Sequence, residues 1–514
     1  MGGQSKSIIG ERAGWFWAGA AAISVGVLLH LPMLAMAHRM GNHLSGMPMD
    51  PEMYVGMALI AIGVPLSCWG ALPPRRSPHG DHAGTNYEAP DSTPLNRWHA
   101  AVLAVLTLGL IIDVMKPATL GFVLPGVREE YGIGKMAALL PLVALTGTTV
   151  GSFVWGWLAD IYGRRVSILL SSILFASTAI CGAMPAFEWN LVMCFLMGCS
   201  AGGMLPVVYA LLAEVMPPKH RSWVLVLVGG TGLVGGYLAA SGAAHLLEPV
   251  YGWRALWLQG FPSGLLLLAL ARFIPETPRF LAEQGRTEEL KLMEQRFGLV
   301  PRPRAVPPAD AASASAAHRK LTAALVVAAL TWSFVNFGLL LWLPTDLQTR
   351  GFSAELASGI LAKSSLLALP TILLCALCYA RLSSKWTLVA TIAVTLAGLV
   401  GALLPASLLT LQPVLIGVIA LLIVGTNGTI AVLLPYTAEN YPLGSRGRAT
   451  GLVAGSSKIG GLPAQVAVLA GFVPTLVGAA AALLIPTAIS AVMIGWAGRE
   501  TRGRSLRELE AGQS

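Results

Sequence analysis

The stretch GWLADIYGRR, residues 156–165, decides how this chain folds. It joins two apolar runs, 137–155 and 166–186, and neither run contains a charged residue. Apolar runs of about 20 residues are long enough to span the hydrocarbon core of a bilayer, so the charged hairpin between them lies at a membrane surface. Within it, Gly156 is expected to let two helix ends approach closely, and Gly163 to permit a turn with positive φ.

The charged residues of this hairpin predict a conformational latch, a set of contacts between helix ends that holds one state of the protein. Asp160 can accept hydrogen bonds from a neighbouring helix end or from an arginine. Arg164 and Arg165 are expected to face the anionic side of the membrane. The alternative is an ordinary positively charged turn between two spans.

The composition is that of a polytopic membrane protein. Hydrophobic residues make up 55% of the 514 residues and charged residues only 11%, which excludes an ordinary soluble globular protein. The net charge of +9 comes from basic residues in short loops between apolar runs, so it indicates a positive-inside bias rather than nucleic-acid binding. No nucleophile–base, zinc or phosphate-loop motif indicates an enzyme, and no cofactor is expected.

The hydropathy pattern predicts fourteen membrane spans in an all-α protein. Two of them, 14–37 and 53–72, form an N-terminal extension over residues 1–72. The polar linker 73–97 is rich in proline and glycine and is expected to be irregular. Twelve core spans follow, at residues 98–124, 137–156, 166–186, 190–213, 222–246, 254–274, 320–344, 354–379, 386–404, 411–438, 449–471 and 474–497.

The core spans divide into two six-helix bundles, residues 98–281 and 320–498. A cytoplasmic loop, 282–319, lies between them and begins with the charged amphipathic stretch TEELKLMEQRFG, and a tail, 499–514, follows the second bundle. The Lys and Arg distribution places both chain ends and the central loop inside, and residues 38–52 outside.

An internal repeat relates the two bundles. The motif A-E-x-x-P-x-x-x-R occurs twice, at Ala213, Glu214, Pro217 and Arg221 and at Ala438, Glu439, Pro442 and Arg446. The motif L-P-x-x-x-x-x-x-G also occurs twice, at Leu124, Pro125 and Gly132 and at Leu343, Pro344 and Gly351. The sixth and the last core spans end in PETPRFL, from Pro275, and RETRGRSL, from Arg499. These matches at consistent offsets predict two homologous halves.

Together, these motifs resemble the sugar-porter and metabolite:proton-symporter branches of the major facilitator superfamily. The segments that carry the resemblance lie within about residues 98–510 and read GWLADIYGRR, AEVMPPKHR, GWR, PETPRFL, AENYPLGSRGR and GRETRGRSL. The resemblance implies a twelve-helix core whose halves rock about a central cavity, here preceded by two extra spans. It also implies that glutamate–arginine pairs hold the outward-open state, with a latch formed by Gly156, Asp160, Gly163, Arg164, Arg165, Glu214, Arg221, Glu276, Glu439, Arg446 and Glu500.

Three departures from the family pattern bear on function. Cys194 precedes Gly198 where sugar porters usually carry an arginine, which weakens the case for a sugar substrate. The second copy of the hairpin reads YARLSSKW, residues 379–386, and lacks its acidic residue. The glycine-rich fifth core span lacks the proline and spacing of the drug-exporter motif, which favours import by symport.

Charged residues inside spans are the strongest indicators of a site, because each costs roughly 2.5–3.5 kcal/mol at the centre of an inserting helix. Asp113 and Lys116 lie three residues apart, on one face of the first core span. Pro117 removes the backbone hydrogen bond to the Asp113 carbonyl. The pattern predicts a proton-binding carboxylate beside a substrate-binding lysine. The alternative is a buried structural ion pair.

Two further lysines lie within spans, Lys363 in LAKSSL and Lys458 in SSKIGG. Together with Lys116 they predict an anionic substrate, although a lysine can also extend to the interface. Other candidates for the lining of the site are polar and aromatic residues that could instead join neighbouring helices, namely Tyr209, Gln259, Trp332, Asn336, Asn427 and Tyr436.

The outer loop of the extension is rich in methionine and histidine. His38, Met40, His43, Met47 and Met49 are candidate ligands for Cu(I). Methionine also fills irregular apolar surface, which is the alternative interpretation.

Three functions are therefore open. The first is proton-coupled uptake of a small organic carboxylate across the plasma membrane, of the bacterial inner-membrane type. The second is import of a metal or metal complex through the Met/His loop, and the third is a membrane sensor that does not transport. The expected partners are the substrate, protons and the lipid bilayer, and not nucleic acid.

The charge distribution makes a testable prediction of topology. In a variant without its native cysteines, a cysteine introduced at Ser45 should react with a membrane-impermeant thiol reagent added to the outer face. A cysteine at Ser313 should react only after the membrane is opened. The opposite labelling pattern would contradict this arrangement.

Overall fold

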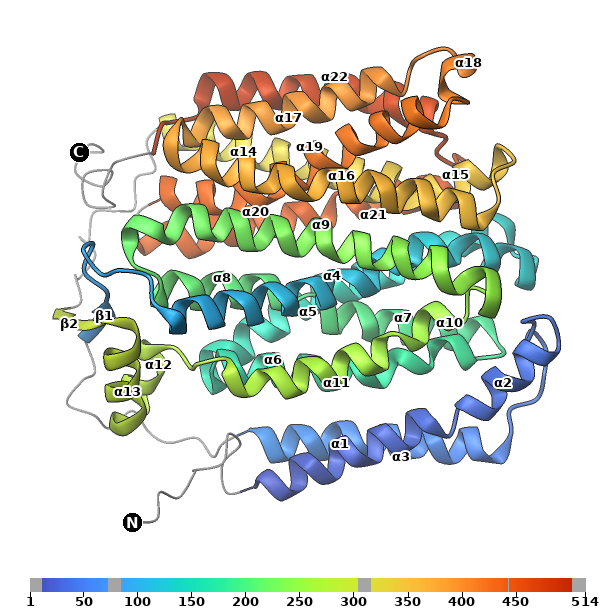
Figure 1. The fold of residues 1–514 in the computed structure, drawn as a ribbon, viewed down its shortest axis with the longest axis horizontal. Coiled ribbons are helices and arrows are strands. Elements are labelled where there is room, and N and C mark those ends of the chain that lie inside the picture. Colours follow the sequence, from blue (N-terminus) through green and yellow to red (C-terminus); the bar gives the residue numbers. More distant parts are fainter. Residues whose placement is uncertain (1–11, 73–84, 304–315, 442, 502–514) are drawn as a thin grey trace.

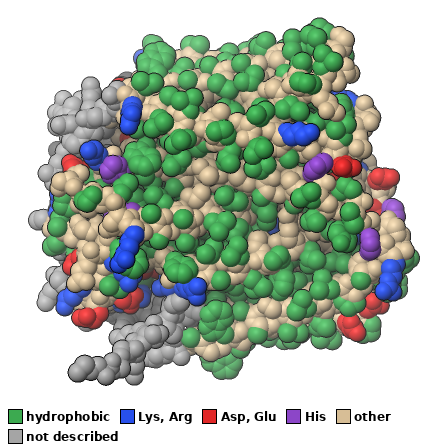
Figure 2. Space-filling model, viewed as in Figure 1, with side chains coloured by type: hydrophobic (Ala, Val, Ile, Leu, Met, Phe, Trp, Pro, Cys, Tyr) green, Lys and Arg blue, Asp and Glu red, His purple; other side chains and the backbone are tan. Residues whose placement is uncertain are grey.

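The computed structural model describes residues 12–72, 85–303, 316–441 and 443–501. Within them, 14 helices are long and apolar enough to cross a membrane. These helices coincide with the predicted spans to within a few residues, which confirms the expected all-α membrane fold. Hydrophobic side chains cover the middle of the face shown in Figure 2, whereas most charged side chains lie toward its two ends.

The helices form an extension and two halves. The extension comprises α1 (Ala13–Leu28), α2 (Leu31–Arg39) and α3 (Pro51–Ala71). The first half comprises α4 (Arg97–Tyr131), η1 (Gly134–Ala138), α5 (Leu139–Tyr162), α6 (Arg164–Ser177), η2 (Thr178–Ala183), α7 (Phe187–Ala201), α8 (Met204–Val215), α9 (Pro218–Tyr251), α10 (Ala255–Leu258), α11 (Gly260–Leu270) and η3 (Ala271–Phe273).

Two short helices and one strand lie between the two halves along the chain, and that strand pairs with another from the linker before α4. They are α12 (Pro278–Glu283), α13 (Thr287–Phe297), β1 (Thr85–Glu88) and β2 (Val300–Pro303). The second half comprises α14 (Ala316–Ser333), the π-helix η4 (Phe334–Leu339), η5 (Leu340–Trp342), α15 (Leu343–Thr349), α16 (Ala354–Arg381), α17 (Ser384–Gly401), α18 (Ala406–Leu409), α19 (Gln412–Asn440), α20 (Leu443–Ile459), α21 (Gly461–Leu469) and α22 (Leu476–Ala497).

The two halves meet mainly along α9 and α16, which lie side by side through the middle of the molecule (Figure 1). The sheet, α12 and α13 lie at one end, called here the α13 end. The opposite end, called here the α2 end, carries α2, α10, α15 and α18. Every long helix runs between these two ends, so contacts at either end can control access to the interface between the halves.

Glycines bring the helices of the extension into close contact. On α3, Gly56, Gly63 and Gly70 are spaced seven residues apart and therefore lie on one face of the helix. On α1, Gly19 and Gly26 have the same spacing, and a Cβ at these positions would lie 2.6 Å from the Gly63 oxygen and 2.7 Å from the Gly56 oxygen. Small residues at such spacing let transmembrane helix backbones approach. The paired helices then pack against α6 of the first half.

One carboxylate anchors the extension at the α2 end. Glu130, in the last turn of α4, accepts hydrogen bonds from the backbone N–H groups of Leu44 (2.7 Å) and Ser45 (3.0 Å). The same carboxylate forms a buried ion pair with Arg254, whose Nη2 lies 2.6 Å from Glu130 Oε1. Trp253 Nε1 donates a further bond of 3.0 Å to Glu130 Oε2. The extension is therefore fixed to the first half by a buried charge cluster.

The linker after the extension is not irregular throughout, contrary to the sequence prediction. Its segment β1 pairs antiparallel with β2, with Asn86 opposite Arg302. Asn96 Nδ2 then donates a hydrogen bond of 2.7 Å to the Arg296 carbonyl at the end of α13. A local composition rich in proline and glycine does not reveal a partner strand some two hundred residues away along the chain. The predicted amphipathic stretch does form a helix, α13, which buries Leu290, Met293 and Phe297.

Glu130→Ala should release the extension and destabilise the protein. It would leave Arg254 buried without its partner, which typically costs about 3–5 kcal/mol. The melting temperature of the purified protein should fall markedly. Glu129→Ala is the matched control, because Glu129 is the exposed neighbouring residue, and this variant should melt like wild type. Equal melting temperatures for the two variants would contradict the anchoring role.

Candidate transport site and latch

Contacts join the two halves at both ends of the molecule. At the α13 end, Ser222 on α9 donates a hydrogen bond of 2.5 Å to Glu439 on α19. At the α2 end, His245 Nδ1 on α9 lies 2.9 Å from the carbonyl oxygen of Glu355 on α16. Toward that end, Gly121 on α4 packs so closely on η5 that a Cβ would lie 2.7 Å from the Leu341 oxygen. The structure thus has inter-half contacts at both ends of the interface.

In the first half, the predicted latch includes the carboxylate of Glu276, which binds the start of helix α6. Glu276 accepts hydrogen bonds from the backbone N–H groups of Arg164 (2.8 Å) and Arg165 (3.2 Å), the first residues of α6. Helix N-termini bind anions because their first N–H groups have no partner within the helix. Gly163 has φ +99°, as predicted, and a Cβ there would lie 2.3 Å from Glu276 Oε2. Burial raises the pKa of Glu276, and the N–H groups of Thr277 and of the helix start oppose this shift.

The two arginines of the hairpin do not simply face the membrane surface. Both are half-buried. Arg164 Nη1 donates to the Ala159 carbonyl at 3.0 Å, near the end of α5. Arg165 donates from Nε to the Ala271 carbonyl at 3.2 Å and from Nη2 to the Arg272 carbonyl at 3.3 Å. Carbonyl groups at a helix end carry partial negative charge, so these contacts tie the ends of α5 and η3 to the start of α6.

The second half repeats this arrangement with different residues. Glu500 accepts from the backbone N–H of Ser384 (2.9 Å) and from its hydroxyl (2.7 Å), at the start of α17. The Ser383 hydroxyl also donates to Glu500. The stretch YARLSSKW lacks the acidic residue of the first hairpin. Its helix start, at α17, is nevertheless bound by a glutamate, as in the first half. Tyr436, predicted to line the substrate site, instead donates to the Arg499 carbonyl at 2.6 Å and belongs to this end.

Glu439 joins the two halves through hydroxyl groups. Besides Ser222, it accepts from Tyr379 (2.7 Å) and Thr501 (2.6 Å). Arg221 lies within electrostatic range of Glu439 and of Glu214, and no ion pair closer than 4.0 Å joins these described side chains. The resemblance implied glutamate–arginine pairs here, whereas the contacts found on Glu439 are neutral hydroxyls. The side chains of Asp160 and Arg446, also predicted for the latch, lie outside the described part of the chain.

Gly156 does not mediate the close helix approach that its position predicted. A Cβ at Gly156 would meet nothing within 4 Å. The close approach occurs five and nine residues earlier in α5, where a Cβ at Gly151 or Gly147 would lie 2.2 Å from a carbonyl oxygen of α7. On the opposite side of this contact lie Gly198 in α7 and Gly202 directly after the end of α7. The small-x-x-x-small spacing on both helices is the sequence signal that identifies this contact.

Two charged residues within the spans, Asp113 and Lys458, belong to different halves and lie within electrostatic range of each other. Asp113 on α4 is 6% exposed, and none of the described hydrogen bonds involves its carboxylate. Lys458 on α20 is the positive charge that acts on Asp113, and Asp113 is the negative charge that acts on Lys458. The sequence predicted both residues as candidates but did not predict that they act on each other.

Lys116 does not pair with Asp113, contrary to the expectation from their spacing. Its Nζ donates to the Phe175 carbonyl at 2.6 Å and to the Thr178 hydroxyl, within the first half. It also lies 4.5 Å from the centroid of the Phe175 ring, a cation–π contact. Only 1% of Lys116 is exposed. Residues three apart on a helix diverge by about 60° around its axis, which is enough for one to face the partner half and the other its own bundle.

The remaining residues that the sequence predicts for the substrate site differ in their hydrogen bonding and exposure. Gln259 Nε2 donates to Thr119 Oγ1 at 3.0 Å, Trp332 Nε1 to the Thr426 carbonyl at 2.7 Å, and Asn427 Nδ2 to the Ile423 carbonyl at 3.0 Å. Asn336 lies half-buried in the π-helix η4, a kind of segment that is frequent at functional sites. Lys363 is exposed, as are its neighbours Leu366 and Leu367. This exposure fits a lysine that extends toward the membrane interface better than one that lines a substrate site.

Two buried tyrosine hydroxyls have no hydrogen-bond partner among the described residues. They belong to Tyr209 on α8, a predicted candidate, and to Tyr237 on α9, which the sequence analysis missed. A buried hydroxyl without a partner is costly, so a bound ligand or water can stabilise it. Gln465 on α21 was also missed. It joins Trp342 Nε1 (3.0 Å) to the Phe337 carbonyl (2.8 Å) beside η4.

The candidate ligands of the Met/His loop differ in their surroundings. Met47 and Met49 pack against the hydrophobic core, whereas His38, Met40 and His43 are exposed. Among the described residues, no group of three or more His, Cys, Asp or Glu side chains could hold a metal ion. Met47 and Met49 fit the alternative interpretation, in which methionine fills apolar surface.

The sequence model of the Major Facilitator Superfamily matches residues 101–465. The chain belongs to this superfamily. It is a multi-pass membrane transporter, as predicted, and not an enzyme. The fold is also that of the proton:xylose symporter XylE, whose solved structure has a TM-score of 0.62 and 16% identity over 81% of this chain and 99% of XylE.

Two curated relatives of this transporter are informative. The niacin transporter NiaP of Acinetobacter baylyi is 25% identical over 449 residues, which cover 82% of this chain and 98% of NiaP. The 4-hydroxybenzoate transporter PcaK of Pseudomonas putida is 29% identical over 295 residues, which cover 52% of this chain and 63% of PcaK.

The two glycines of the hairpin give a matched test of the latch. Gly163→Ala forces a side chain into a positive φ and against Glu276, so it should destabilise the protein by about 1–3 kcal/mol and slow transport. Gly156→Ala has free space within a helix and should be neutral or slightly stabilising. Thermal melting and initial uptake rates would measure both effects. Equal behaviour of the two variants would contradict the role of the Gly163–Glu276 contact.

Proposed function

We propose that this transporter takes up a small organic carboxylate together with protons by alternating access. The observation that carries the proposal is the pair Asp113–Lys458, one charge from each half, with no hydrogen bond to either group among the described residues. Two of its relatives are named as a niacin transporter and a 4-hydroxybenzoate transporter. These names support a small aromatic acid as the substrate. In this proposal, Lys458 binds the substrate carboxylate and Asp113 binds the coupled proton.

The two binding events favour each other electrostatically. Without substrate, the charge of Lys458 stabilises the ionised form of Asp113. A carboxylate bound at Lys458 partly neutralises that charge and adds a second negative charge nearby. Asp113 then takes up a proton more readily, and a protonated Asp113 in turn leaves Lys458 free for the substrate. Such reciprocal coupling is what a symporter requires.

Alternating access would open the inter-half contacts at one end at a time. Opening the α13 end breaks the Ser222–Glu439 bond, and opening the α2 end breaks the His245–Glu355 contact. The glutamate-bound helix starts at Glu276 and Glu500 lie within single halves, so each half can move as a unit while they stay intact. Asp113 and Lys458 separate as the halves rock, which exposes both groups to the open side.

The two other functions have less support. A metal importer would need ligands that converge, and the Met/His loop divides between core packing and exposure. A sensor without transport activity would not need to keep contacts at both ends of the interface and charges between the halves.

The substitution Asp113→Asn should uncouple transport from protons. The variant mimics the protonated aspartate, so it should exchange labelled substrate across the membrane but fail to accumulate it in response to an acidic exterior. Lys458→Met removes the charge that binds the carboxylate, and it should lower the affinity for substrate at least tenfold. Proteoliposome assays with labelled nicotinate, benzoate and 4-hydroxybenzoate would measure exchange and accumulation separately.

Lys363→Met is the matched control for Lys458→Met, because Lys363 is an exposed lysine within a span of the same half. It should transport like wild type. Accumulation by Asp113→Asn under a pH gradient would refute the coupling role of Asp113. Unchanged affinity in Lys458→Met would refute the carboxylate site.

A further inference from the structure

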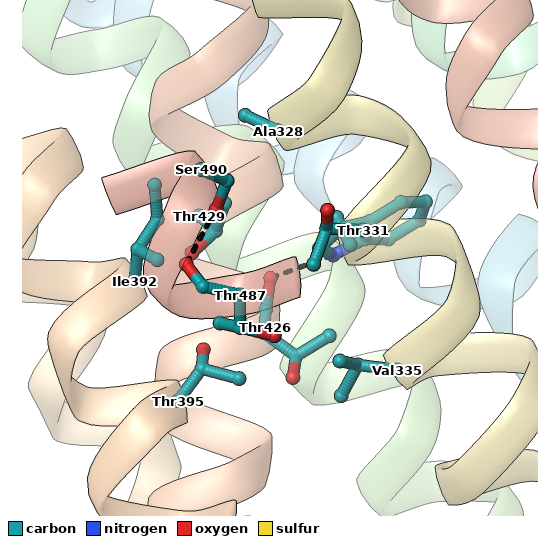
Figure 3. A pocket seen from close by; sticks show the side chains of 10 residues that line it. Ala328, Thr331, Val335, Ile392, Thr395, Thr426, Thr429, Thr487 and Ser490 are labelled. Atoms are coloured by element: carbon teal, nitrogen blue, oxygen red, sulfur yellow. Dashed lines mark hydrogen bonds between the residues drawn. The ribbon is translucent and has the colours of Figure 1, made fainter. Parts of the chain in front are cut away.

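The second half contains a small internal void with room for no more than one water molecule. It lies among α14, α17, α19 and α22 (Figure 3), and the volume open to the centre of a water molecule is about 10 Å³. A cavity needs roughly 10–15 Å³ on this measure to hold one water molecule. None of the described residues that line it is charged. The surface at the α13 end differs, because charged side chains gather there.

Three arginines lie where helices of the first half reach the membrane surface at the α13 end. Arg97 is the first residue of the span Arg97–Tyr131, and Arg272 lies one residue before the end of the span Ala255–Phe273. Arg296 lies in the last turn of α13, and both α13 and η3 contact α4. Figure 2 shows Lys and Arg side chains at this end, beside the hydrophobic surface. These three residues are called here the boundary arginines, and their positions are those of side chains that meet lipid headgroups.

Trp98 holds two of the boundary arginines beside one indole ring. The Cζ atom of Arg296 lies 4.1 Å from the centroid of the Trp98 ring, and the Cζ atom of Arg97 lies 5.3 Å from it. Stacking on an aromatic ring orients the planar guanidinium group and leaves the N–H groups at its edge able to donate. Trp98 is half-buried, and tryptophan is enriched at the level of the headgroups. Trp98 therefore combines an anchor in the membrane interface with two oriented donors.

Contacts between α13 and the start of α4 fix this arrangement. Asn96 Nδ2 donates a hydrogen bond of 2.7 Å to the Arg296 carbonyl. The rings of His99 and Phe297 meet edge to face with their centroids 5.1 Å apart, and both residues are buried. The residues adjoining Arg97 and Arg296 are thus packed together, so the two guanidinium groups share one place on the surface.

The boundary arginines form no ion pair with any described residue. On the neighbouring helices α12 and α13, acidic side chains instead pair locally, namely Glu283 with Arg279, Glu288 with Lys291 and Glu289 with Arg286. These carboxylates therefore do not compensate the charge of the boundary arginines. The guanidinium group of Arg272 stacks on Phe273, with its Cζ atom 4.7 Å from the ring centroid, and this ring is exposed at the end of its span.

We propose that the boundary arginines and Trp98 bind the phosphate group of an anionic membrane phospholipid. Guanidinium groups bind phosphate through paired, charge-assisted hydrogen bonds. The exposed ring of Phe273 lies at the level where the acyl chains of a bound lipid begin, and a soluble phosphate would gain nothing from this ring or from Trp98. The bound lipid would join α4, η3 and α13. The site does not include Asp113 or Lys458 and does not rest on the proposed function.

Lipid titrations of the purified full-length protein in detergent, followed by native mass spectrometry, test the proposal. Wild type should bind its first phosphatidylglycerol molecule more tightly than phosphatidylcholine with the same acyl chains. The double variant Arg97→Gln/Arg296→Gln removes both charges beside Trp98 and keeps polar side chains. Its affinity for phosphatidylglycerol should fall roughly tenfold, whereas its affinity for phosphatidylcholine should stay unchanged.

Arg286→Gln/Lys291→Gln is the matched control, because it removes the same charge from the α13 end at residues that are already paired with carboxylates. It should bind phosphatidylglycerol like wild type, and an equal loss in this control would assign the effect to net charge and overturn the site. Equal affinity of wild type for the two lipids would overturn the proposal whether or not the variants fold. Unchanged binding in the double variant beside Trp98 would also overturn it. Inorganic phosphate that binds as tightly as phosphatidylglycerol would assign the boundary arginines to a soluble phosphate and refute a lipid site.

Discussion

The rest of the structure depends on glutamate side chains bound at the starts of two helices. Glu276 binds the first N–H groups of α6, and Glu500 binds the start of α17. In each case a residue from the end of a half satisfies a helix start that would otherwise lack partners near the membrane surface. Each contact closes its own six-helix bundle, so the two halves can rock as compact units.

Glu439 and the pair Asp113–Lys458 differ from those contacts because they cross between the halves. Glu439 binds Ser222 through a neutral hydroxyl, a contact that breaks at lower electrostatic cost than an ion pair would. Asp113 and Lys458 place opposite charges on the two moving parts. Stable contacts within the halves and separable contacts between them are the arrangement that alternating access requires.

The N-terminal extension is attached to the first half and not to the interface. Its helices pack on α6, and its loop is held by Glu130 at the α2 end. The linker that follows pairs with the segment after α13 at the opposite end. The described contacts of the extension are therefore with the first half and with the elements at the α13 end.

The sequence by itself determined the fourteen spans and the twofold repeat, and it identified Gly163, Asp113 and Lys458 as candidate functional residues. Span length, repeated spacing and the cost of charge in a membrane are local properties, and each can be read from neighbouring residues. Only the tertiary structure decided that Lys116 contacts its own bundle and that Lys458, from the other half, lies within electrostatic range of Asp113. It also decided that the close helix approach occurs at Gly147 and Gly151 rather than at Gly156, and that part of the linker forms a strand. These outcomes depend on which helix lies opposite, and the spacing of residues along one helix does not contain that information.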